Sequence, residues 1–379
     1  MRIRSVESFP IRLPRDIGEA TGRAGSPTVL AAGASSYRWS QVFPCLYSTD
    51  FETAVVRLTT DCGKVGWGEA QAPLAPEVAC AIVDRLLAPV LVGQEFDASP
   101  AGVAWWWDRM YSAMRVRGQT GGFMLDAISG VDIALWDLAG KAAGKPVCEL
   151  LSAAPKRSIP AYFSGLPSSG RGDAARRAMD QGFGMFKLFY DTADASAFFS
   201  AMDTLPEASY AVDALWRHTP DSAVAFGREL DARGATWFEA PLAPEDPHAH
   251  GELAAAIVTP VAIGESYRTR FELAPFFQAG AVEVLQPDLG RCGITEGMRL
   301  AAEAARRGIP VVPHLSIAFG PQIAAALHFA AAASNCDLAE FNPSVLDTAN
   351  RFLASPLAMV GGAYVVPGEP GLGIEPRLP

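Results

Sequence analysis

Seven acidic and basic residues recur at a nearly fixed interval through the second half of the chain, and each stands where a short apolar stretch ends. They are Lys187, Asp213, Glu239 and Glu265, spaced 26 residues apart, followed by Asp288, His314 and Glu340 at intervals of 23, 26 and 26. This interval matches one strand–loop–helix–loop unit of a parallel α/β barrel. Because polar residues at the ends of successive parallel strands converge on one mouth of such a barrel, the spacing predicts a functional site there.

The chain has 379 residues, and a barrel of about 200 to 250 residues leaves room for a second domain. Alternating apolar and polar residues predict strands over 2–13, 51–60 and 65–70, with a hairpin turn at 61–64. Helical patterns follow near 75–92, 97–116 and 123–143, and further helices alternate with strands at 174–181, 223–233, 271–279, 294–307 and 321–333. We expect an α+β capping domain at 1–135, a barrel at 136–350 whose first strand lies near 157–162, and a tail at 351–379 that packs back on the capping domain.

A segment rich in Gly, Ala, Ser and Arg separates the first two predicted strands, at about residues 14–50. Loops of this length are commonly lids or binding loops. Its candidates for contact with an anionic ligand are Arg15, Arg23, Tyr37, Arg38 and Trp39. The alternative is a surface loop without a binding role.

Composition restricts the class of ligand. The net charge is −10, which argues against a nucleic-acid partner because phosphate binding requires a basic surface, so a small molecule is expected. The start of the chain lacks the apolar core of a secretory signal, and the six cysteines form no Cys-x-x-Cys pair, so we expect a cytoplasmic protein without disulfides. The uncharged stretch 308–336 is interrupted by Pro313, His314 and Gly320-Pro321, which excludes a membrane span.

Several short motifs, in this order and at these spacings, resemble the mandelate racemase and muconate lactonizing enzyme branch of the enolase superfamily. They are Val65-Gly-Trp-Gly-Glu-Ala70, Ser129-Gly-Val-Asp-Ile-Ala-Leu-Trp-Asp137, Phe238-Glu-Ala-Pro241, Gly264-Glu-Ser266 and Leu285-Gln-Pro-Asp288. The resemblance implies a modified TIM barrel, (β/α)7β, with an α+β N-terminal capping domain completed by the C-terminal tail. It also implies a homo-oligomer, as a dimer or octamer. The stretches around Val312–His314, Gln322–Leu327 and Pro370–Ile374 are most similar to galactarolactone cycloisomerase-like members.

The same resemblance implies that Asp213, Glu239 and Glu265 bind one Mg²⁺ ion. The chemistry of the residues agrees, because three carboxylates at one barrel mouth repel one another unless a hard cation neutralises them. A divalent ion bound to a substrate carboxylate stabilises the charge that develops when the neighbouring α-proton is removed.

His314 is the candidate base for that proton. It ends the strand that follows the one ending in Asp288, so a carboxylate beside the imidazole would fix its tautomer and raise its basicity. The alternative is a core histidine satisfied by the backbone. His248 and His250 are expected in a solvated Pro-rich loop.

Lys187 departs from the pattern of many relatives, which carry Lys-x-Lys on the second barrel strand. Here the second position is Phe189, which faces the same way as Lys187 and cannot move a proton. Lys187 is therefore expected to bind the substrate carboxylate, and Tyr162, Tyr190 or Lys187 itself is a candidate acid. Glu340 resembles an acid that hydrogen-bonds the substrate carboxylate; the alternative is a helix-capping surface acid. The substrate-binding candidates are Lys187, Glu340, Tyr162 and Trp39.

The predicted activity is Mg²⁺-dependent abstraction of a proton α to a carboxylate, with dehydration of an acid sugar, an aldonate or aldarate, as the leading reaction. Cycloisomerisation of a sugar-acid lactone is the alternative. A racemase or epimerase is less favoured, because it needs proton transfer on both faces of one carbon. A barrel that binds a sugar acid without turning it over is the non-enzyme alternative.

Overall fold

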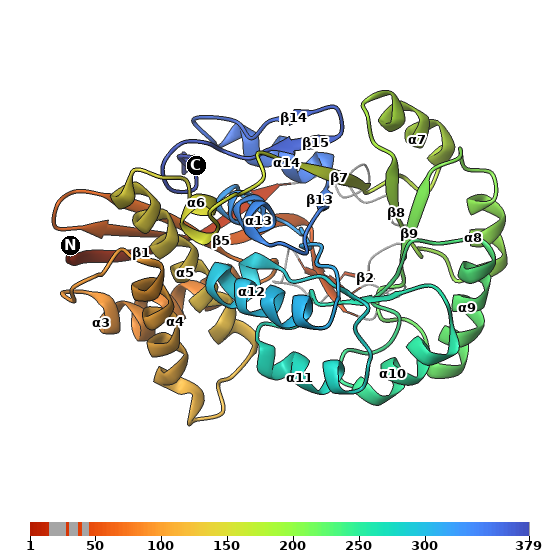
Figure 1. Ribbon diagram of the computed structural model, residues 1–379, viewed down its shortest axis with the longest axis horizontal. Helices are drawn as coiled ribbons and strands as arrows, with labels where there is room; N and C mark the ends of the chain where they lie inside the picture. Colours follow the sequence, from red (N-terminus) through yellow and green to blue (C-terminus); the bar gives the residue numbers. More distant parts are fainter. Residues whose placement is uncertain (15–27, 30–36, 40–44, 379) are drawn as a thin grey trace.

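The computed structural model describes residues 1–14, 28–29, 37–39 and 45–378, and it places an α+β cap beside an α/β barrel (Figure 1). Arg15 and Arg23, two of the lid candidates, lie outside the described residues. The described part of the lid forms a small antiparallel sheet in the order β2-β3-β4. Its strands are β2 (Thr28–Val29), β3 (Tyr37–Trp39) and β4 (Leu46–Ser48).

The cap is built on an antiparallel sheet in the order β1-β5-β6, as the alternating patterns predicted. The strands β5 and β6 pair from Ala54 with Ala70 to Thr59 with Val65. Gly63 takes the left-handed conformation in the turn between them, with φ 81°, which glycine adopts without steric cost. The strand bounds are β1 (Ile3–Pro14), β5 (Asp50–Thr60) and β6 (Val65–Ala70).

Helix α5 (Gly122–Ala143) is the central helix of the cap, and it is buried on all sides from Met124 to Gly140. It packs against β6 on one side and against α12 (Leu289–Arg306) of the barrel on the other. In α4 (Pro100–Arg115), Trp106 and Trp107 are buried while Trp105 is exposed, because three consecutive helix positions cannot share one face. The other cap elements are α2 (Pro76–Ile82), the π-helical turn η1 (Val83–Leu87), α3 (Ala88–Leu91) and α6 (Val147–Leu151).

The barrel strands form a parallel ladder in the order β13-β7-β8-β9-β10-β11-β12. Two isolated parallel bridges, Leu285 with Val311 and Asp288 with His314, add the next segment to β12. Among the described residues no ladder joins that segment to β13, so the ring of strands is not a continuous ladder. The bounds are β7 (Ser158–Ser164), β8 (Met185–Phe189), β9 (Ser209–Asp213), β10 (Phe238–Glu239), β11 (Val261–Ile263), β12 (Val284–Leu285) and β13 (Ala339–Phe341).

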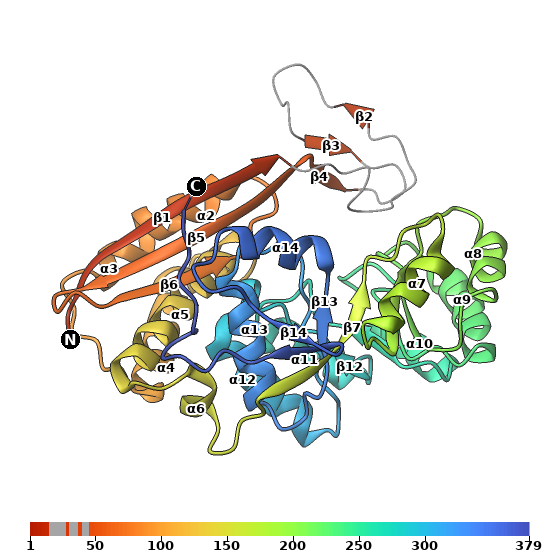
Figure 2. The ribbon, with the colours of Figure 1, turned by 90° about the horizontal axis from the view of Figure 1, so that it is seen from above.

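Helices alternate with these strands and cover the outside of the barrel (Figures 1 and 2). The regular part of α12 begins at Ile294, as predicted, because Gly293 has a non-helical conformation (φ 74°, ψ 173°) that separates it from a short turn at 289–292. The side chain of Asp288 caps that turn by accepting from the Gly290 N–H. His248 and His250 lie on α10 rather than in a loop; His250 is buried, whereas His248 is exposed to solvent as expected. The helices are α7 (Arg171–Asp180), α8 (Ala195–Met202), α9 (Pro220–Ala232), α10 (Pro247–Ala256), α11 (Arg270–Gln278), α13 (Pro321–Ala332) and α14 (Pro343–Arg351).

The last residues contact both domains. Strands β14 (Met359–Val360) and β15 (Ala363–Val365) form a hairpin whose second strand pairs antiparallel with β7 of the barrel. Further along, the buried carboxylate of Asp137 on α5 accepts hydrogen bonds from the backbone N–H of Leu372 and of Trp67, each at 2.8 Å. In Figure 2 the C-terminus lies over the cap sheet. The tail therefore spans from the barrel to the cap, while the exact domain bounds stay predictions.

Within the described ranges, none of the helices combines the length and the apolar character that crossing a membrane requires. The stretch 308–336, which carries no charged residue, forms a bridge segment, a loop and the buried helix α13.

We expect Gly68→Ala to destabilise the fold, because β6 and α5 approach so closely that a Cβ at this position would lie 1.9 Å from the carbonyl oxygen of Gly130. Overpacking of this kind costs about 1–3 kcal/mol, measurable as a lower midpoint of urea unfolding. Gly184→Ala is the matched control, since a Cβ there meets no atom within 4 Å and should change stability by less than about 0.5 kcal/mol. Equal stability of the two variants would contradict the close packing.

Candidate active site

The seven polar residues predicted at strand ends gather at one mouth of the barrel. Lys187 lies within β8, Asp213 and Glu239 end β9 and β10, and Glu340 lies in β13. Glu265 follows β11 by two residues, and Asp288 and His314 face each other across a parallel bridge. Except for the partly exposed Glu265 and His314, these side chains are buried, so their charges must compensate one another.

Lys187 is the central cation of this cluster. Its ammonium lies 2.7 Å from Glu239 Oε1, 2.9 Å from Glu340 Oε1 and 3.8 Å from Asp213 Oδ2. Burial alone would lower the pKa of Lys187, but the charges of Glu239 and Glu340 outweigh it and raise that pKa well above its ordinary value. Lys187 is therefore a permanent cation, and a charged Lys187 does not accept a proton.

Glu340 is 4 % exposed and accepts a hydrogen bond from the Leu315 N–H at 3.0 Å as well as the ion pair with Lys187. This burial excludes the alternative of a surface acid. Burial would raise the pKa of Glu340, but the charges of Lys187 and His314 lower it, which keeps the carboxylate ionised.

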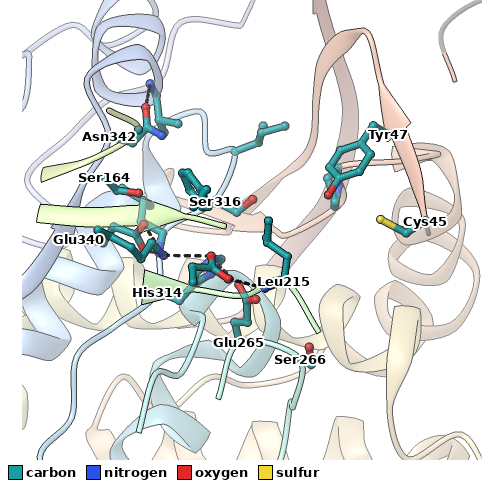
Figure 3. Close-up of a pocket in the computed structure, with 18 of the residues that line it drawn as sticks. Cys45, Tyr47, Ser164, Leu215, Glu265, Ser266, His314, Ser316, Glu340 and Asn342 are labelled. Carbon is teal, nitrogen blue, oxygen red and sulfur yellow. Dashed lines mark hydrogen bonds and ion pairs between the residues drawn. The ribbon is translucent and has the colours of Figure 1, made fainter. Parts of the chain in front are cut away.

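His314 lies between the carboxylates of Asp288 and Glu265, and Figure 3 shows it beside Glu265. Its Nδ1 is 2.9 Å from Asp288 Oδ2, and its Nε2 is 2.5 Å from Glu265 Oε2. Burial would lower the pKa of His314, but the charge of Glu265 and the hydrogen bonds to Asp288 and Glu265 raise it well above its ordinary value. The alternative of a histidine satisfied by the backbone is excluded, because both ring nitrogens face carboxylates.

The surrounding charges and burial shift the pKa of Glu265 downward and the pKa of Asp213 upward. The pKa of Glu265 falls to about 2, because His314 and then Lys187 and Arg291 overcome the effect of burial. The pKa of Asp213 is raised well above its ordinary value by burial and by the charges of Glu239 and Glu265, against the smaller effect of Lys187. Three neighbouring carboxylates therefore leave a residual repulsion that one ammonium does not remove.

This repulsion is the observation that tests the implied metal. The donor set of Asp213, Glu239 and Glu265 consists of carboxylate oxygens, which fit a hard divalent cation such as Mg²⁺. Among the described residues, however, no three acidic, histidine or cysteine side chains converge closely enough to hold an ion. Lys187 and His314 instead take oxygens of Glu239 and Glu265. The residues fit the ion chemically, and binding it requires these two contacts to open.

A cavity of about 280 Å³ lies over the cluster. Lys187, Asp213, Glu265, His314 and Glu340 line its floor. The hydroxyl and amide groups of Ser164, Ser316, Asn342 and Ser344 line one side, and the lid residues Cys45, Leu46, Tyr47 and Ser48 line the other (Figure 3). The charged floor and the hydroxyl and amide groups suit a polyhydroxylated anion, and apolar side chains such as Leu74, Trp216 and Ile317 line the rest of the cavity.

Of the four predicted substrate-binding residues, Lys187 and Glu340 line the cavity, whereas Tyr162 and Trp39 do not. Tyr162 is fully buried and packs edge-on against Trp237 inside the barrel, in a cluster with Ala211, Ala262, Val284 and Val312. It does not line the cavity, and neither does Trp39, which is 41 % exposed on β3. Phe189 does line it, and its ring lies 5.5 Å from the Lys187 ammonium. The cavity thus presents an aromatic ring where many relatives are expected to carry a second lysine.

Several residues at this site went unnoticed in the sequence. Glu239 Oε2 accepts from Trp237 Nε1 at 3.0 Å and from Gln286 Nε2 at 2.8 Å. Leu215 lines the cavity and donates its N–H to Asp213 from a left-handed backbone conformation, with φ 56°. Such strain in a residue with a β-carbon clusters at functional sites. Of these residues only Gln286 could have been identified from the sequence, because it stands two residues before the strand-end residue Asp288.

The cap, the barrel of parallel strands and the acidic mouth with its lysine and histidine define the class: enzymes that handle carboxylate-bearing substrates at the end of a capped barrel. Comparison with known families agrees. Residues 47–152 match the mandelate racemase / muconate lactonizing enzyme N-terminal domain, and residues 171–379 match the enolase C-terminal domain-like family. The chain therefore belongs to the mandelate racemase and muconate lactonizing enzyme branch of the enolase superfamily.

Its relatives include enzymes of acid sugars. It is 35 % identical over 344 residues to D-galactarolactone cycloisomerase of Agrobacterium fabrum, covering 85 % of this chain and 88 % of that one. It is 31 % identical over 356 residues to D-galactonate dehydratase of Verminephrobacter eiseniae, covering 84 % and 87 %. A solved structure of an enolase superfamily member from Agrobacterium tumefaciens superposes with a TM-score of 0.92 at 33 % identity, covering 99 % of this chain and 97 % of that one.

Glu265→Gln should lower the pKa of His314 toward its ordinary range when no metal is present, because the charge of Glu265 is the main influence that raises it. The measurement is an NMR titration of the histidine ring protons, with His314 assigned by its loss in His314→Asn. Glu340→Gln is the matched comparison and should move the pKa of His314 less, since Glu340 exerts a weaker effect on that ring. A larger shift in Glu340→Gln would contradict the arrangement.

Proposed function

We propose that this protein removes the proton α to the carboxylate of an acid sugar and then eliminates water, as an acid sugar dehydratase. The observation that carries the proposal is the imidazole of His314 held by Asp288 at the cavity floor, beside the cation of Lys187 and the three carboxylates. This arrangement offers one base and a positive charge for an anionic substrate.

In this proposal Asp213, Glu239 and Glu265 hold one Mg²⁺ ion. When bound, the ion supplies Lewis-acid stabilisation of the negative charge that develops on the substrate carboxylate. Glu265 must leave His314 for this to happen, and the departure has a second effect. It removes the main charge that keeps the imidazole protonated, so the ring nitrogen Nε2 becomes available to accept a proton.

His314 is the proposed base. Asp288 accepts from Nδ1 and fixes the ring so that Nε2 points toward the cavity, because Asp288 itself lies buried behind the ring. Nε2 takes the α-proton and then returns it to the β-hydroxyl on the same face, which departs as water. One residue thereby serves as base and then as acid.

Lys187 is proposed to bind the substrate carboxylate, and the ionised Glu340 is proposed to act through Lys187. Lys187 contributes its fixed charge, and Glu340 orients Lys187 through their 2.9 Å ion pair. Phe189 leaves no proton carrier opposite His314 on β8, which favours elimination by a single base over racemisation. Direct substrate contacts of Trp39 and Tyr162 stay predictions, as do closure of the (β/α)7β ring, the homo-oligomer and the cytoplasmic location.

Cycloisomerisation of a sugar-acid lactone is the second candidate. It is supported by the relative that is 35 % identical and named D-galactarolactone cycloisomerase. It needs the same first step, removal of an α-proton, and differs only in which carbon–oxygen bond breaks.

We expect incubation with Mg²⁺ and D-galactonate or D-galactarolactone in deuterated water to give turnover of an acid sugar. Mass spectrometry of the same reactions in ordinary water distinguishes them. Dehydration removes one water from the substrate, whereas opening of the lactone ring by cycloisomerisation leaves the mass unchanged. Deuterium at an α-carbon, seen by NMR, would exclude a barrel that only binds. If screening a library of acid sugars and lactones with this protein gave no water loss, ring opening or deuterium uptake, the result would contradict the proposal.

His314→Asn should lower kcat by about 100- to 10,000-fold, the usual contribution of a general base. Mg²⁺ affinity, measured by calorimetry, should be retained or increase, because the ligands belong to other residues and the contact of His314 with Glu265 no longer has to open. His248→Asn is the control, since His248 is exposed on α10 and should leave both quantities alone. A His314→Asn variant with activity near that of the parent would refute its role as base.

A further inference from the structure

Asp288, which orients His314, is itself held by two hydrogen bonds on its other oxygen. The side chain is fully buried. Its Oδ1 accepts from the Gly290 N–H at 2.8 Å and from Gln322 Nε2 at 3.0 Å, while Oδ2 faces His314. Because a carboxylate can rotate about its last bond, two donors on one oxygen fix the plane in which the other oxygen meets the imidazole.

Both donors are tied to the cap rather than to the barrel alone. The backbone N–H of Gln322 donates to Glu69 Oε2 on β6 at 3.0 Å. The carbonyl of Gly290 accepts from the Gln71 N–H at 2.8 Å and from the hydroxyl of Ser129 on α5. Two chains of hydrogen bonds therefore connect the cap to Asp288, one through Gln322 and one through Gly290.

Glu69 is the anchor of the first chain of hydrogen bonds. Its carboxylate is fully buried and also accepts from the N–H groups of Phe319 and Gly320, at 2.5 and 3.1 Å. These residues end the loop that begins at His314 and lines the cavity through Leu315, Ser316 and Ile317. One cap carboxylate thus fixes both this loop and the start of α13.

We propose that Gln322 is a positioning residue for His314, and that Glu69 of the cap sets the place of Gln322. Gln322 is not among the residues that line the cavity, and its amide donates to Asp288 rather than to His314, so it would act through Asp288. Gly290 lies close to this amide, since a Cβ at position 290 would be 2.3 Å from Gln322 Oε1. The catalytic role of the barrel histidine therefore depends on docking of the cap. This inference rests on the proposed role of His314 as base.

The test compares Gln322→Met, which keeps the length of the side chain but removes the donor, with the parent protein. With Mg²⁺ and D-galactonate or D-galactarolactone, kcat should fall by about 10- to 100-fold, as expected when a partner behind a catalytic group is lost, while KM stays within about 2-fold. A merely structural role would lower the unfolding temperature without this selective loss of kcat.

Thr295→Val is the matched control. Thr295 on α12 donates its hydroxyl to the buried Asp132 on α5 at 2.6 Å, so this variant also breaks a buried bond between cap and barrel, but one that does not lead to Asp288. It should leave kcat within about 2-fold of the parent. An equal fall in Thr295→Val and Gln322→Met would overturn the proposal, since general loosening of the two domains would then explain both.

A second measurement needs no turnover. The Nδ1 proton of His314, recorded by NMR without substrate and assigned by its loss in His314→Asn, should shift and exchange faster with water in Gln322→Met but not in Thr295→Val. An unchanged resonance would overturn the proposal. If Gln322→Met does not fold, Gly290→Ala displaces the same amide and should give the same change. If the parent turns over neither probe, the proposed function fails, while the NMR comparison still decides the role of Gln322.

Discussion

Five carboxylates, one ammonium and one imidazole share a barrel mouth in which most of these side chains are buried, and the rest of the structure serves to hold them there. Buried charges are stable only when they are paired and hydrogen-bonded. Lys187 pairs with Glu239 and Glu340, and His314 pairs with Glu265 and Asp288. Removing one partner would leave an uncompensated charge, so the cluster behaves as a unit.

In the proposed mechanism this cluster has two states, one without and one with a divalent cation. In the state described here, Lys187 and His314 supply the positive charge that the acids need. Burial, together with the charges of Glu239 and Glu265, raises the pKa of Asp213 despite the opposing charge of Lys187. A divalent cation would take over the role of His314 toward Glu265 and leave the imidazole neutral. Binding of the ion and activation of the base are therefore linked in the proposed mechanism, because both depend on where Glu265 points.

The cap contributes more than a cover for the cavity. Its lid residues line one wall, and its β6 and α5 reach through Glu69, Gln71 and Ser129 to the groups that hold Asp288. Close contact between these elements depends on glycines such as Gly68 and Gly130, which have no side chain to keep them apart. A barrel without the cap would lose this support for its histidine.

The sequence by itself determined the order of strands and helices and the residues that end the barrel strands. Both follow from local pattern: apolar periodicity sets the elements, and a repeat near 26 residues places every marked side chain at the same height. It could not give the short turn at 289–292 that precedes this helix, or the burial of His250, because one capping hydrogen bond and packing between helices decided them. Only the tertiary structure decided that Lys187 forms ion pairs with the acidic residues, that Tyr162 is buried outside the cavity and that Gln322 donates a hydrogen bond to Asp288. These contacts join residues from 26 positions apart, as for Lys187 and Asp213, to 253 positions apart, as for Gln322 and Glu69. No local pattern records which distant groups a folded chain brings within hydrogen-bonding distance.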